Sequence, residues 1–123
     1  QHVHHRAQQR GAGAEAARLI NEAQQVNAAV TMAGVDGTTL SDIDALVTGQ
    51  YLSQVPGKFA GNASVTGADI STTGVADNVC IEVQLKATGT KPADMAAVGA
   101  TKQTGQLYGC YGAGSNNNTF YNL

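Results

Sequence analysis

The sequence lacks the features that mark several large classes of protein. It has no tryptophan, only two prolines and two cysteines, and aromatic residues make up 5% of its 123 residues. Charged residues are also scarce, at 13%, and lysine and arginine never cluster, so the sequence carries no footprint of nucleic-acid binding. No run approaches the roughly 18 apolar residues of a membrane-spanning helix. We therefore expect the chain as given to be soluble.

Catalytic motifs are missing as well. There is no nucleophile elbow and no glycine-rich phosphate loop with a lysine, and no histidine follows His5 to pair with a serine or cysteine. The cysteines are not spaced as CxxC, which argues against a thioredoxin-like redox site. The sequence therefore predicts no catalytic residue, no cofactor, no metal site and no enzymatic activity. The enzymatic alternative is a small hydrolase without a visible motif.

Two groups of polar residues deserve comparison with cation sites. Asp36, Asp42 and Asp44 surround an expected helix start, where carboxylates complement the helix dipole, and we favour that role over a metal or acid–base site. The asparagines at 116–118 offer side-chain oxygens, but no Asp or Glu adjoins them. We favour a solvated loop at 112–118.

Glycine is the residue that the chain has in abundance, with fifteen, and its core must be built from small and mid-sized aliphatic side chains. Such a single-domain core is modest, so a covalent cross-link would help it. An even number of cysteines, Cys80 and Cys110, favours one disulfide formed in an oxidising compartment, with two unrelated thiols in a cytosolic protein as the alternative. Closing a loop of about 31 residues would contribute on the order of 3–4 kcal/mol.

One long amphipathic helix is predicted over residues 13–33, ending at Gly34. Its apolar side chains recur at steps of three and four, and we expect that face to pack on a sheet. The face consists of Ala16, Leu19, Ile20, Ala23, Val26, Val30 and Ala33. No convincing N-cap precedes it, so the helix resembles the end of a longer one. Residues 1–13, which hold all three histidines, are either a tag or linker or the start of that helix, and 14–123 form the globular part.

The rest of the chain changes from helical to strand periodicity. A short helix is expected at 40–48, and one or two helical turns at 91–98. Strands are predicted at 62–66, 69–73, 79–85, 106–111 and 119–123. The strongest is 79–85, in which alternate apolar residues share one face and Cys80 lies on the other. Helices followed by hairpin-connected strands predict an α+β fold with an antiparallel sheet.

Aromatic and amide side chains gather near the C-terminus. Such residues are common at interfaces and in ligand stacking, although ordinary packing of the last strands explains them equally. The predicted exposed contact region comprises Tyr108, Tyr111, Asn116, Asn117, Asn118 and Tyr121.

Four features together resemble type IV pilins. The alanine-rich helix at 15–33 is similar to the C-terminal half of the long pilin helix. The segment 46–56, LVTGQYLSQVP, is similar to the stretch that joins helix to sheet in pilins. Cys80 and Cys110 are placed like the disulfide that bounds the C-terminal region of pilins, and their long separation is closest to the type IVb style. The ending 120–123 completes the likeness, whereas the hydrophobic pilin N-terminus with its early glutamate is not in the sequence.

The resemblance implies a structural subunit of a bacterial pilus. A hydrophobic N-terminal half-helix would hold the subunit in the inner membrane before assembly and would then pack in the filament core. The implied partners are other copies of the chain and the pilus assembly machinery, and the filament is extracellular. Segment 34–61 would meet neighbouring subunits, and segment 80–110, with the tail after it, would be exposed and variable. The resemblance implies that such a pilus would serve adhesion, motility or DNA uptake. Alternatives are a type II secretion pseudopilin, a minor pilin, or a secreted binding or adhesion module.

Overall fold

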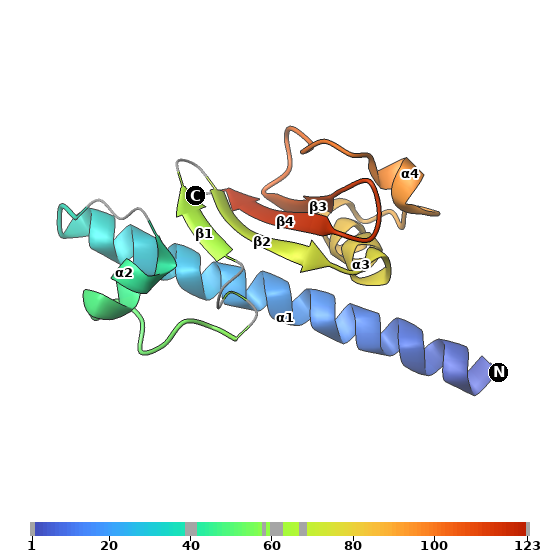
Figure 1. The fold of residues 1–123 in the computed structure, drawn as a ribbon, viewed down its shortest axis with the longest axis horizontal. Helices are drawn as coiled ribbons and strands as arrows, with labels where there is room; N and C mark the ends of the chain where they lie inside the picture. The colour runs from blue at the N-terminus through green and yellow to red at the C-terminus, as the bar shows by residue number, and fades with distance from the viewer. Residues whose placement is uncertain (1, 39–41, 58, 60–62, 67–68, 123) are drawn as a thin grey trace.

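The chain folds as a long N-terminal helix packed against an antiparallel sheet, as Figure 1 shows. The computed structural model describes residues 2–38, 42–57, 59, 63–66 and 69–122, with only the backbone of 2–10 and 63–66. The elements are α1 (His2–Val35), α2 (Ile43–Thr48), β1 (Ala63–Thr66), β2 (Asp69–Val75), α3 (Asp77–Thr88), α4 (Met95–Val98), β3 (Tyr108–Tyr111) and β4 (Asn117–Asn122). The predicted α+β class is confirmed. Residues 40 and 41, parts of 34–61, and Leu123 lie outside the described residues.

Helix α1 is longer than predicted, because it runs through 34 residues from His2 with no break at residue 13. Its buried side chains follow one stripe at steps of three and four: Ala12, Ala16, Leu19, Ala23, Val26, Ala29 and Ala33. Five of the seven members of the predicted face are therefore buried: Ala16, Leu19, Ala23, Val26 and Ala33. Ile20 and Val30 are only partly buried. No helix in the described part of the chain is both long and apolar enough to cross a membrane.

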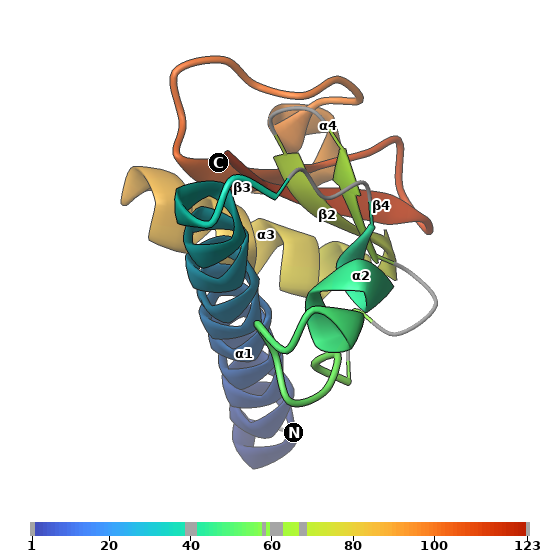
Figure 2. The same cartoon turned by 90° about the vertical axis from the view of Figure 1, so that its left-hand side faces the viewer.

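The stripe on α1 contributes to two separate hydrophobic clusters. The C-terminal half of α1 packs with α2, Phe59, Ile70 of β2 and Tyr121 of β4. The N-terminal half packs with α3, Val98 of α4 and the two cysteines. Figure 2 shows α3 beside α1. The helix face predicted to hold the sheet therefore packs on α3 as well as on the sheet.

The predicted strand at 79–85 is wrong, because these residues form the middle of helix α3. Its apolar residues fit both periods, and the buried set Val79, Cys80, Val83 and Gln84 is a helical stripe rather than one face of a strand. Gly89 ends the helix in the left-handed conformation, φ 83°, which glycine adopts without strain. Packing between α1 and β3 outweighs the strand preference of the β-branched residues.

The sheet has the strand order β1-β2-β4-β3, and every pairing is antiparallel. The last strand, β4, therefore lies inside the sheet. Asp69 at the start of β2 is paired with Asn122 at the end of β4. The predicted loop at 112–118 is too long, because β4 begins at Asn117. The strands predicted at 62–66, 69–73 and 106–111 agree with β1, β2 and β3 within two residues.

Cys80 and Cys110 form the predicted disulfide, which joins α3 to β3. The predicted position of Cys80 away from the hydrophobic side is wrong, because both cysteines are fully buried within the cluster around the N-terminal half of α1. Cys80 is on the inner face of a helix rather than the outer face of a strand. The disulfide therefore cross-links the core itself.

Candidate functional site

Two of the three acidic residues considered as cation ligands accept structural hydrogen bonds. Asp42 caps α2 by accepting a hydrogen bond from the Ala45 backbone N–H at 2.9 Å. Asp36 accepts one from the Tyr51 hydroxyl at 2.8 Å. Asp44 lies in the first turn of α2. Within the described residues no three His, Cys, Asp or Glu side chains gather as a metal site.

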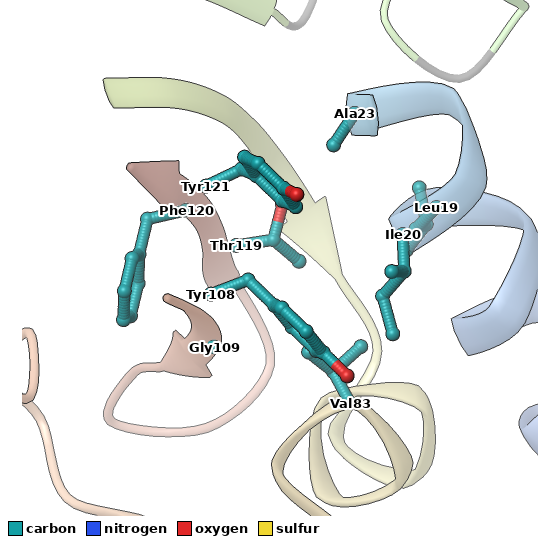
Figure 3. A pocket seen from close by; sticks show the side chains of 9 residues that line it. All are labelled: Leu19, Ile20, Ala23, Val83, Tyr108, Gly109, Thr119, Phe120 and Tyr121. Carbon is teal, nitrogen blue, oxygen red and sulfur yellow. The ribbon is translucent and has the colours of Figure 1, made fainter. Parts of the chain in front are cut away.

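The tyrosines at the end of the chain are part of the core more than of the surface. Tyr108 of β3 and Tyr121 of β4 are paired in register, with parallel rings 6.0 Å apart, and Figure 3 shows both pointing toward α1. The cavity beside them has a volume of about 10 Å³. That is about the space of one water molecule, so the cavity has no room for a ligand. Burial, with Tyr121 alongside, raises the pKa of Tyr108.

The predicted exposed contact region is wrong in part. Asn117 is fully buried and Tyr121 is 7% exposed, because both side chains fill the space between the sheet and its neighbours. Tyr108, Tyr111 and Asn118 are partly buried, and only Asn116 is fully on the surface. The six residues do not form one continuous exposed surface.

Asn117 organises the turn between β3 and β4. Its side-chain amide donates to the backbone oxygen of Val75 at 2.9 Å and to the carboxylate of Asp77 at 2.8 Å. Its oxygen accepts from the Gly114 backbone N–H at 3.2 Å. A Cβ at Gly112 would overlap the Asn117 side chain, so glycine is required there. Within the asparagine run, Asn117 is thus a buried structural cross-link, whereas Asn116 is exposed.

The hydrogen bonds of Asp77 are expected to make the free energy of unfolding depend on pH. Hydrogen bonds from Asn117 and from the Ser115 backbone hold the pKa of Asp77 below its ordinary value. A lowered folded-state pKa contributes stability above the unfolded-state pKa, about 3.9, and that stability is lost as the pH falls through the folded-state value. We expect wild type to lose more stability between pH 5 and 3 than Asp77→Asn does, as measured by urea unfolding at each pH. Parallel losses in both proteins would contradict this role for Asp77.

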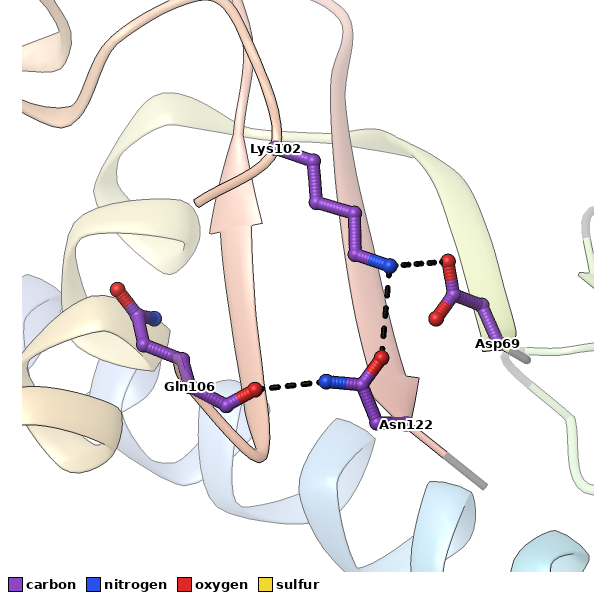
Figure 4. A network of polar contacts seen from close by, with 4 residues as sticks. All are labelled: Asp69, Lys102, Gln106 and Asn122. Carbon is purple, nitrogen blue, oxygen red and sulfur yellow. Dashed lines mark hydrogen bonds and ion pairs between the residues drawn. The ribbon is translucent and has the colours of Figure 1, made fainter. Parts of the chain in front are cut away.

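A polar network on the outer side of the sheet was not predicted from the sequence. Lys102 pairs with Asp69 at 2.5 Å and lies 3.4 Å from the side-chain oxygen of Asn122, as Figure 4 shows. Asn122 also donates to the backbone oxygen of Gln106 at 2.7 Å. The Lys102 ammonium lies 4.9 Å from the ring centroid of Phe120. These residues come from β2, the 99–107 segment and β4, and no motif in the sequence links them.

Gln84 is a second polar residue whose role the sequence did not reveal. It is buried at 6% exposure on α3, and its oxygen accepts from the Cys110 backbone N–H and from the Gln106 side chain, both at 3.0 Å. A Cβ at Gly109 would come within 2.6 Å of that oxygen. Gln84 thus reinforces the junction between α3 and β3 next to the disulfide.

Comparison with known proteins adds no identification. No family model matches the chain, and no curated protein or solved structure shows significant similarity to it.

Proposed function

We propose that this chain is the globular head of a type IV pilin-like subunit, a structural protein that polymerises into an extracellular filament. The observation that carries the proposal is helix α1. It has 34 residues and is therefore about 51 Å long. Its N-terminal turns extend beyond α3 and the sheet, as Figure 1 illustrates. A helix that protrudes from its own domain suits a subunit that joins its neighbours through that helix.

The packing of α1 supports the same role. Its buried stripe is dominated by alanine, with five alanines among its seven members, so the helix lies close against α3 and the sheet. The stripe runs from Ala12 to Ala33 and holds the helix along both clusters. A force applied along α1 would therefore be spread over the whole head, as a filament subunit requires.

The surface next to α1 supports contact between copies. An open groove lies between the outer side of α1 and the turn at 54–57, and both polar and apolar side chains line it. Arg18, Glu22 and Gln25 face it from the helix, and Gln54 and Pro56 face it from the turn. The groove falls in the helix-to-sheet connection, where the resemblance to pilins implies contacts with adjacent subunits.

The disulfide supports an extracellular location. Cys80 and Cys110 are bonded and buried, and such bonds persist in oxidising compartments. The bond also secures the segment between α3 and β3 to the core, as a subunit exposed on a filament needs.

The proposal can be tested on cells that carry the gene for this chain. We expect antibodies raised against residues 1–123 to label surface filaments in electron micrographs. We expect the encoded chain upstream of residue 1 to hold a short basic leader and about 20 apolar residues with an early glutamate. Cells with the gene deleted serve as the control. An ordinary signal peptide with no labelled filaments would instead favour a secreted binding module.

A further inference from the structure

Lys102, Asp69 and Asn122 bring an amine, a carboxylate and an amide together on the outer side of the sheet. Asp69 and Asn122 are directly opposite each other across β2 and β4, which places their side chains close together on one face of the sheet. Lys102 reaches over from the 99–107 segment, and Figure 4 shows its ammonium between the carboxylate and the amide. We infer that this cluster is an intramolecular cross-linking site, at which the Lys102 amine and the Asn122 side chain join as an amide (isopeptide) bond.

The orientation of Asn122 favours attack at its side-chain carbonyl. Its nitrogen donates to the Gln106 backbone oxygen at 2.7 Å, which turns its oxygen toward Lys102, 3.4 Å away. The carbonyl carbon is one bond beyond that oxygen. Holding the amine beside the amide replaces a bimolecular encounter with a unimolecular step. The other end of the cluster is the Phe120 ring, whose face holds the lysine head group in place.

Asp69 is placed to carry the protons. One of its oxygens is paired with Lys102. The other is buried and has no hydrogen-bond partner among the residues that the structure describes. The Asp69 side chain is 28% exposed and that of Lys102 is 36% exposed, so the pair is partly shielded from water. A carboxylate in contact with an amine can accept its proton and return it to the leaving group.

The reaction balances without any added reagent. Asp69 takes a proton from the Lys102 ammonium, and the free amine attacks the Asn122 side-chain carbon to give a tetrahedral intermediate. The bond from that carbon to the amide nitrogen then breaks. Two protons from the lysine nitrogen pass to the departing nitrogen through Asp69, so ammonium leaves and the Asp69 carboxylate is restored. One C–N bond forms, one breaks, and nothing is oxidised or reduced.

The bond would have a clear structural effect. It would close a covalent loop from residue 102 to residue 122 and fix the 99–107 segment to the end of β4. That loop would overlap the one closed by Cys80 and Cys110, because residues 102–110 belong to both. The inference does not depend on the proposed filament function, because it concerns only contacts within one chain.

The test is peptide mapping of the purified chain after denaturation, reduction and trypsin digestion. Lys91 precedes proline, so cleavage after Lys102 separates peptides 87–102 and 103–123. We expect wild type to yield a single peptide, 87–123, lighter by one ammonia molecule. In its fragmentation spectrum, cleavage of one backbone bond between residues 102 and 122 should release no separate fragments, because the cross-link still joins the two parts. Locating the loss in this peptide is essential, because an N-terminal glutamine can cyclise with the same loss.

Matched variants identify the chemistry. Lys102→Arg keeps a cation but lacks the amine, and Asp69→Asn keeps the amine but lacks the proton carrier. We expect both variants to give 87–102 and 103–123 as separate peptides. Lys91→Arg alters another ion-paired lysine, 3.3 Å from Glu82, and we expect it to retain the cross-link. Wild type that is fully cleaved after Lys102, even after long incubation, would overturn the inference, and so would a cross-link that survives in Asp69→Asn.

Discussion

The substitution Val26→Asp is expected to abolish folding of the chain. Val26 is fully buried on α1, in the cluster that holds Ile70 and Tyr121. A carboxylate at this position would be shielded from water. An uncompensated buried charge lowers the free energy of unfolding by about 3–5 kcal/mol, in addition to the effect of the lost apolar contacts. The free energy of unfolding of a domain is only about 5–15 kcal/mol. We therefore expect circular dichroism and thermal melting to show no cooperative transition.

The matched control for this prediction is Gln25→Asp. Gln25 precedes Val26 on the same helix but is exposed, so the new carboxylate stays in water and only the helix propensity changes. We expect a loss below about 1 kcal/mol. A melting curve for Val26→Asp that resembles that of Gln25→Asp would show that the buried stripe on α1 is wrongly assigned.

Removal of the disulfide is expected to give the second large effect. The double substitution Cys80→Ala and Cys110→Ala removes the covalent bond between α3 and β3, which joins residues 30 positions apart in the sequence. Removing a native disulfide from a small domain lowers the free energy of unfolding by about 2–5 kcal/mol. Guanidinium unfolding should therefore show a lower midpoint for the double variant than for wild type.

Chemical reduction provides the control for that experiment. Wild type unfolded in the presence of a reductant should have a midpoint close to that of the double variant, because both lack the cross-link. The core has little else to replace it, since large aromatic side chains are few. If the double variant and oxidised wild type unfolded at the same denaturant concentration, the bond would contribute no stability.

The sequence predicted the parts of the fold that rest on local periodicity. The stripe of α1 was visible because alanine, leucine and valine recur at helical spacing over many turns, and Gly34 lies close to the observed end of the helix. The fold class followed from the order of elements. The disulfide followed from there being two cysteines, although its buried position did not.

The failures occurred where tertiary contacts decide. Residues 79–85 contain alternating β-branched side chains, yet the surfaces of α1 and β3 select a helix there. Asn117 looks like a loop residue in the sequence, but Val75 and Asp77 supply partners from 42 and 40 residues away. The Lys102 cluster has the same origin, since Asp69 is 33 residues distant. No local pattern encodes such pairings.

The position of β4 between β2 and β3 has a consequence for biosynthesis. The ribosome makes β2 some forty residues before β4. While α3, α4 and β3 emerge, β2 therefore lacks β4, its hydrogen-bonded partner on one side. The sheet is therefore completed only after residue 122 has left the exit tunnel. Such non-local pairing slows folding and leaves strand edges exposed during synthesis. Nascent chains stalled before residue 117 should thus remain protease-sensitive and recruit chaperones.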